Sequence, residues 1–221
     1  MFLNTLKFAN SRLKIVLKYS TVAAKCWKCG VSRQSQVDLF CEKCNVIQAP
    51  TKEGNFFKVF NYQNSYNVDM KDLTNKYRKM QSVLHPDKFT NKSKEEQQIS
   101  EEYSSLVNKA YNTLQIPLSR ALHLLSLHGE VITENDKATD QNFLMEMMEL
   151  NEEIEEAETP DALKALDLKN KQVLSQLALD IAKTFDGGNI AMAKELIIKM
   201  KYFNSLGMRI NTLLRDRGIV D

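Results

Sequence analysis

Glycine and proline are scarce in this chain, with 7 Gly and 4 Pro among 221 residues. A β-sandwich or barrel needs turn residues about every 8–12 positions, so the scarcity excludes such folds and favours long helices. No apolar run approaches the roughly 18 residues that would span a bilayer. Four cysteines are too few for a disulfide-built fold. A hydrophobic fraction of 43% and a charged fraction of 26% exclude disordered and collagen-like chains.

Acidic residues are absent from the first 37 positions, which contain seven basic ones. The first 25 residues are basic, rich in hydroxyls and amphipathic, and this composition is typical of a mitochondrial transit peptide. A secretory signal needs an unbroken apolar core, which Lys14 and Lys18 interrupt. We therefore predict a transit peptide over 1–25 and a mitochondrial matrix protein, with a cytoplasmic pool also compatible. A basic arm without a targeting role is the alternative.

The opposite charge dominates residues 138–163, which contain nine acids and no Lys or Arg. Such asymmetry of charge along a chain indicates that the basic and acidic segments have different functions. The net charge is only +2, which argues against a strongly basic nucleic-acid binder.

The four cysteines form two CxxC pairs separated by eleven residues. They are Cys26, Cys29, Cys41 and Cys44. Two such pairs can place four sulfurs around one ion in a tetrahedral set, and Gly30 follows the first pair, where the backbone often needs a positive φ. We predict a four-cysteine zinc-knuckle module over residues 26–50, holding a structural Zn²⁺ with no open coordination position. Iron at the same sulfurs, or a redox-active dithiol pair, are the alternatives.

Residues 56–116 predict two helices joined by a loop. Asp69 has the character of an N-cap, with Asp72 as its capping-box partner. The apolar stripe of the first helix is Leu73, Tyr77, Met80 and Leu84. This helix must end near His85, because Pro86 disfavours helical geometry in the residue before it. A second helix is predicted from about Ser93 to Leu114.

The remainder of the chain also reads as helix. A short helix over 119–128 ends at Gly129, a longer one covers 143–157, and Thr159-Pro160-Asp161 begins another. Asp186-Gly187-Gly188-Asn189 ends that helix and caps the last one. We predict an all-α fold, in which a helical hairpin and connecting helix over 55–128 precede an antiparallel three-helix bundle over 129–221.

No arrangement typical of an enzyme emerges. His85 and Asp87 are two residues apart on a tight loop, and no Ser or Cys nucleophile can be placed beside them. His123 and His128 belong to an apolar helix, where packing or surface roles are commoner than ligand roles. No glycine-rich phosphate loop exists in the sequence. We therefore predict that the protein is not an enzyme.

The tripeptide His85-Pro86-Asp87, between a basic helix and a second helix, resembles a J-domain, the module that stimulates ATP hydrolysis by DnaK-type chaperones. The stretch from Arg120 to Gly129, followed by Phe143-Leu144-Met145-Glu146, is similar to the HscB (Jac-type) co-chaperones of iron–sulfur cluster assembly. This likeness runs from about Phe56 to the C-terminus. A tetracysteine module ahead of the J-domain resembles the animal mitochondrial members.

The resemblance implies an adaptor with two binding surfaces. The J-domain would contact a mitochondrial DnaK-type chaperone through His85, Pro86 and Asp87. Cations on the preceding helix would steer that encounter, and they are Lys76, Arg78 and Lys79.

The C-terminal bundle would bind the scaffold protein on which iron–sulfur clusters are built, and so promote cluster transfer to recipient apoproteins. The positions that match the scaffold-contacting motif of the family are Leu144, Met145, Met148 and Tyr202. Family members commonly carry Leu where this chain has Met148. Met147, by contrast, is predicted to lie in the bundle core.

A zinc-ribbon nucleic-acid-binding protein is the alternative from another functional class. The four cysteines, Trp27 and the nearby basic residues favour it, whereas the modest net charge and the acid-rich half oppose it. The co-chaperone interpretation includes neither nucleic acid nor membrane among the partners.

Overall fold

The computed structural model of the chain describes residues 25–33, 38–50, 54–133, 136 and 140–218. Apart from two isolated β-bridges, the regular elements in these ranges are helices, which confirms the all-α prediction. No helix in the described ranges is long and apolar enough to cross a membrane. The predicted transit peptide lies outside the described residues, except for Lys25 at its end.

The helices follow one another from residue 56 to residue 216. They are α1 (Phe56–Val59), α2 (Met70–Leu84), the short 3₁₀ helix η1 (Pro86–Phe89), α3 (Lys94–Gln115), α4 (Pro117–Leu127), α5 (Gln141–Glu156), α6 (Pro160–Asp186) and α7 (Ile190–Asp216). The predicted helices are all present, with ends that agree to within a few residues.

Local side-chain chemistry sets most of the helix starts. The carboxylate of Asp69 accepts hydrogen bonds from the backbone N–H groups of Lys71 and Asp72, as predicted for an N-cap. The capping-box role predicted for Asp72 is wrong, because its side chain instead accepts a hydrogen bond from Tyr62 Oη at 2.6 Å. The helix predicted to begin at Ser119 begins earlier, with Pro117 in the first turn, where a missing N–H costs nothing.

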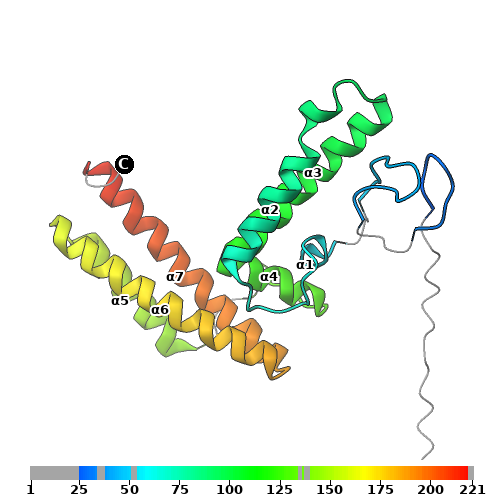
Figure 1. Ribbon diagram of the computed structural model, residues 1–221. Helices are drawn as coiled ribbons and strands as arrows, with labels where there is room; N and C mark the ends of the chain where they lie inside the picture. The colour runs from blue at the N-terminus through cyan, green and yellow to red at the C-terminus, as the bar shows by residue number, and fades with distance from the viewer. Residues whose placement is uncertain (1–24, 34–37, 51–53, 134–135, 137–139, 219–221) are drawn as a thin grey trace, which may run out of the picture.

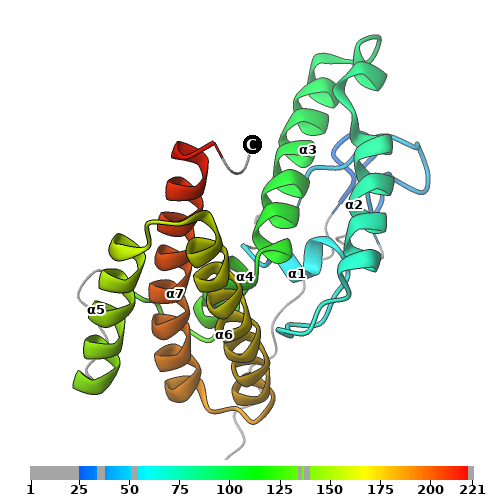
Figure 2. The same cartoon turned by 90° about the vertical axis from the view of Figure 1, so that its left-hand side faces the viewer.

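Two arms extend from a shared central region (Figures 1 and 2). One arm is the α2–α3 hairpin, which carries the η1 turn at its far tip. The other is the antiparallel bundle of α5, α6 and α7, in which α5 lies at the outer edge (Figure 2). Helix α4 lies between the arms and packs against both α3 and α7.

One hydrophobic core continues through the hairpin, α4 and the adjoining ends of α6 and α7. Leu73, Val107 and Leu125 are fully buried in it, together with Ile181 and Ile197 from the bundle. The outer part of the bundle has its own core, which includes Phe143, Leu163, Phe203, Leu206 and Ile210. The inner ends of the bundle are therefore packed into the same core as the hairpin, and this fixes how the two arms diverge.

A buried arginine reinforces the junction of the arms. Arg120, which is 8% exposed, donates from Nη1 to the backbone oxygen of Leu114 at 2.7 Å, at the C-terminal end of α3. Its guanidinium lies 4.8 Å from the ring centroid of Tyr66, and that ring stacks on Phe185 at the end of α6. Burial lowers the pKa of Arg120. This chain of contacts joins α3, α4 and α6.

Candidate functional site

The His-Pro-Asp tripeptide lies at the tip of the hairpin, at the end away from α4 (Figure 1). The side chains of His85 and Asp87 are 57% and 84% exposed, with His85 Nδ1 at 3.4 Å from Asp87 Oδ2. The backbone N–H of Lys88 donates to the His85 oxygen at 2.9 Å, so Pro86 to Phe89 form a turn of 3₁₀ helix. A short, hydrogen-bonded turn thus presents both polar side chains to solvent.

Contacts from α3 anchor this turn on both sides. On the α2 side, the buried hydroxyl of Ser100 donates to the backbone oxygen of Leu84 at 2.7 Å, and so satisfies a helix-terminal carbonyl that has no partner in its own helix. Phe89 is buried in the main core. On the other side, Gln97 donates to the backbone oxygens of Thr90 and Lys92 at 3.0 and 3.1 Å.

The three predicted steering cations do not share one environment. Arg78 and Lys79 are exposed on α2. The ammonium of Lys76 lies 2.9 Å from Asp72 Oδ2 and 3.8 Å from the ring centroid of Tyr62. The hydrogen bond from Tyr62, followed by that from Lys76, lowers the pKa of Asp72. The structure therefore leaves two of the cations facing solvent and ties the third into an intramolecular cluster.

Three of the four predicted scaffold-contacting residues lie in the first turns of α5, and we call these three, Leu144, Met145 and Met148, the α5 patch. Met145 and Met148 are 59% and 64% exposed, whereas Met147 is buried in the bundle core, as predicted. Tyr202, on α7, is half-buried and meets Phe143 edge-on, with ring centroids 5.5 Å apart. Because Phe143 directly precedes Leu144, the structure brings Tyr202 to the same end of α5.

The four cysteines converge on one point, although two loops carry them. Their sulfur atoms all lie within 4.8 Å of one another. The Cys26–Cys44 and Cys29–Cys41 sulfurs are each 3.7 Å apart. In a tetrahedron with metal–sulfur bonds of about 2.3 Å, the sulfurs stand roughly 3.8 Å from one another. The arrangement therefore fits a tetrahedral metal ion of that bond length.

Each CxxC pair forms a knuckle whose backbone N–H groups point at the first sulfur. Burial raises the pKa of Cys26, but hydrogen bonds from the N–H groups of Cys29 and Lys28 act against it and lower the pKa to about 6. The N–H of Cys44 similarly lowers the pKa of Cys41. Burial raises the pKa of Cys44 to about 12. The knuckles thus favour thiolate, the form that binds metal, at the first cysteine of each pair.

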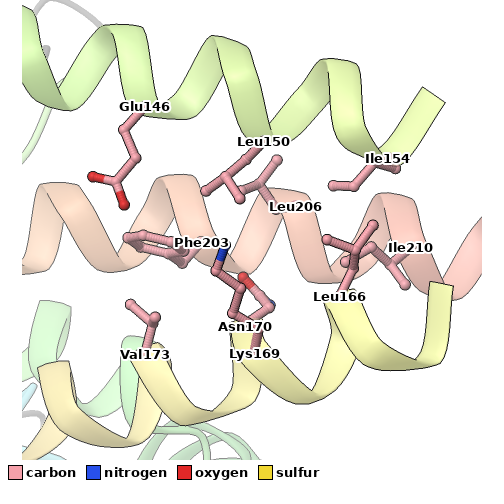
Figure 3. A pocket seen from close by; sticks show the side chains of 10 residues that line it. All are labelled: Glu146, Leu150, Ile154, Leu166, Lys169, Asn170, Val173, Phe203, Leu206 and Ile210. Carbon is pink, nitrogen blue, oxygen red and sulfur yellow. The ribbon is translucent and has the colours of Figure 1, made fainter. Parts of the chain in front are cut away.

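Helices α5, α6 and α7 leave a narrow slot between them (Figure 3). Its volume is ≈ 30 Å³, which is room for only a couple of water molecules. Leu150, Phe203 and Leu206 line its walls, with Asn170 between them. Glu146 and Lys169 also line it.

The sequence patterns did not indicate the roles of Ser100 and Gln97, which anchor the turn, or of Tyr62, which binds Asp72. Ser100 and Leu84 are 16 residues apart, and Tyr62 precedes Asp72 by ten. No local pattern connects such pairs. The capping box of Ser93 and Glu96, which starts α3 directly after the turn, could have been found from its three-residue spacing.

Comparisons with known proteins agree with this fold. The family described as "HSCB C-terminal oligomerisation domain" matches residues 139–211. The mouse protein named "Iron-sulfur cluster co-chaperone protein HscB" is 36% identical over 193 residues, covering 86% of this chain and 82% of that protein. The crystal structure of human co-chaperone protein HscB is similar with a TM-score of 0.81 and 36% identity, over 86% of this chain and 98% of that one. Chaperone HscB from Vibrio cholerae is similar with a TM-score of 0.66 and 28% identity, over 75% and 99% of the two chains.

Proposed function

The chain belongs to the HscB family of iron–sulfur cluster co-chaperones, and on that premise we propose that it stimulates ATP hydrolysis by a mitochondrial DnaK-type chaperone. The family is one of co-chaperones and not of enzymes, so the hydrolysis takes place on the partner. In this proposal the J-domain and its connecting helix cover residues 55–128, and the nucleic-acid-binding alternative is set aside.

The observation that carries the proposal is the exposed and pre-anchored turn at the tip of the hairpin. His85 and Asp87 face solvent, while Ser100 and Phe89 hold the backbone of the turn against α3. A group that is already held in its binding geometry loses little conformational entropy when it binds. The exposed cations of α2 would raise the rate of encounter with an acidic surface of the chaperone.

The bundle over 129–221 is proposed to bind the iron–sulfur scaffold protein and deliver it to the chaperone, promoting cluster transfer to recipient apoproteins. Two exposed methionines in the α5 patch support this, since flexible thioether side chains adapt to an apolar partner surface. Tyr202 adds a half-buried ring beside the patch. The two arms would then hold chaperone and scaffold at a set separation.

The cysteine cluster is proposed to hold a structural Zn²⁺ within residues 26–50. All four sulfurs would be ligands, and the sulfur–sulfur distances of 3.7 Å suit that ion. Such a closed site contributes folding energy and leaves no position for a substrate. A mitochondrial matrix location, with a transit peptide over 1–25, belongs to the same proposal.

The test is steady-state ATP hydrolysis by the matching mitochondrial DnaK-type chaperone, with scaffold present, comparing wild type and His85→Gln. We expect wild type to stimulate hydrolysis and the variant not to, although both have the same circular dichroism spectrum and thermal midpoint. Since His85 is exposed, its replacement should leave folding unaffected. Equal stimulation by both proteins would show that the turn is not the working surface.

A further inference from the structure

The four-cysteine module packs against the J-domain and shares its hydrophobic core. Ile47, which directly follows the second knuckle, is fully buried in the core that also contains Phe89 of the η1 turn and Tyr103 of α3. Trp27 and Phe40, from the two loops of the module, pack against the same core. The loops lie beside the hairpin in Figure 1 and behind it in Figure 2.

The buried side chain of Gln48 joins the sulfurs to this core, beside Trp27, which packs against both. Gln48 is 1% exposed, and its Nε2 lies 3.4 Å from Cys26 Sγ and 2.9 Å from the backbone oxygen of Val46. The same Nε2 lies 3.2 Å from the backbone oxygen of Ile47, which also accepts a hydrogen bond from Trp27 Nε1 at 2.6 Å. The position of Ile47 in the core is thus tied to the position of Cys26 in the cluster.

The core that contains Ile47 also includes Tyr103 of α3, next to the His-Pro-Asp turn. Arg33 and Asp38 lie near enough to the buried ring of Tyr103 to act on its pKa, which burial raises, Arg33 lowers and Asp38 raises. Tyr103 is on the helical turn after Ser100, whose hydroxyl holds the backbone oxygen of Leu84 next to His85. Gln48, Ile47 and the core that includes Tyr103 and Phe89 therefore connect the sulfurs to the turn.

We propose that the metal-bound cysteine module holds the His-Pro-Asp turn in its chaperone-binding position, and that Gln48 is the positioning residue that links the two. The effect on the chaperone rests on the proposed function, whereas the effect on the turn does not. A bound ion fixes both knuckles, so that residues 46–48 have a rigid support. Without it, the local opening of α3 and the turn becomes easier, because the support of Ile47 is lost.

Hydrogen exchange on the full-length protein tests whether the metal-bound module stabilises the turn. Zn²⁺-loaded protein is compared with protein stripped by a chelator in the presence of a reductant, and exchange is followed by mass spectrometry. We expect amides in residues 84–107 to exchange roughly five to thirty times faster after stripping, the range that a small loss of local stability gives. Residues 201–214, in the outer bundle, serve as the internal control and should not change. Unchanged exchange over 84–107 would overturn the proposal.

The variant Gln48→Ala tests the link itself, with Gln176→Ala on the exposed face of α6 as the matched control. Gln48→Ala keeps all four thiol ligands, so it should bind one Zn²⁺ and still show faster exchange over 84–107. In the ATPase assay it should need a severalfold higher concentration for half-maximal stimulation and reach the same maximum, because His85 and Asp87 are intact. Wild-type exchange and half-maximal concentration in Gln48→Ala would exclude Gln48 as the link.

The two proposals fail in different ways. If wild-type protein does not stimulate the chaperone at all, yet stripping speeds exchange over 84–107, the proposed function is wrong and the support of the turn by the module stands. If wild type stimulates the chaperone and stripping changes neither exchange nor the half-maximal concentration, the function stands and the module has no positioning role.

Discussion

Gly207 on α7 lies directly against the carboxamide of Asn170 on α6. A Cβ at position 207 would be 2.8 Å from Asn170 Nδ2, closer than non-bonded atoms approach, and Asn170 is only 6% exposed. Glycine inside a helix costs about 1 kcal/mol relative to alanine, so its presence there needs a reason. The reason is that the two longest helices of the bundle carry this amide between them, next to the slot of Figure 3.

Replacement of Gly207 by alanine should therefore destabilise the protein, although alanine is the better helix former. We expect the free energy of unfolding to fall by about 1–3 kcal/mol, because the added methyl group overpacks the contact. In an Asn170→Ala background the same replacement should instead gain up to about 1 kcal/mol. A double-mutant cycle by urea unfolding measures the difference, and additive effects would contradict the contact.

The cations of α2 should separate into a structural one and two steering ones. Lys76→Ala should lower the free energy of unfolding by about 1 kcal/mol, since it removes an ion pair with Asp72 and a cation–π contact with Tyr62. Arg78→Ala and Lys79→Ala should leave stability within about 0.5 kcal/mol. They should slow association with the chaperone and weaken its dependence on salt. Stopped-flow association at several ionic strengths, with urea unfolding of each variant, distinguishes these outcomes.

Neighbouring methionines on α5 should behave oppositely. Replacement of the whole α5 patch by alanine should weaken scaffold binding and leave the thermal midpoint nearly unchanged, because Met145 and Met148 are exposed. Met147→Ala should cost about 2–5 kcal/mol of stability, since it leaves a cavity in the bundle core. Calorimetric titration with the scaffold and thermal unfolding are the measurements. Full scaffold affinity in the patch variant would place the interface on another face.

Protonation of His123 should loosen the contact between α4 and α1. Its Nε2 accepts a hydrogen bond from the backbone N–H of Phe56 at 3.0 Å, and its ring stacks on Phe56 at 4.5 Å, where Lys109 is also nearby. Burial lowers the pKa of His123, so the unfolded chain takes up its proton first as the pH falls. The contribution to stability is therefore complete above pH about 6.5 and is lost progressively below it.

The variant His123→Gln checks this pH dependence, because an amide oxygen can accept the same hydrogen bond without titrating. Urea unfolding at pH 7.5 and at pH 5.5 should show a smaller fall in stability for the variant than for wild type. The same fall in both proteins would assign the pH dependence to other groups.

Features that depend on neighbours in the chain could be read from the sequence alone. The caps of Asp69 and Thr159 were predicted correctly because a cap bonds only two or three residues onward. Helical periodicity placed Met147 and Met148 on the same side, and only the resemblance to the family motif assigned Met148 to an exposed surface. The two CxxC pairs predicted one cluster of four sulfurs, since each pair is itself a local structure.

Only the tertiary structure decided which distant residues meet. Nothing local to Ile47 indicates that it enters the core of the hairpin, and the need for glycine at position 207 depends on Asn170, 37 residues earlier. The contact of Lys76 with the ring of Tyr62, which lies in the loop before α2, also joins residues that no local pattern connects. Short-range hydrogen bonds and periodic patterns act within a few residues, so the sequence specifies them directly. Contacts between helices depend on how the whole chain packs its apolar surface, and that is decided only when the arms, α4 and the cysteine module share one core.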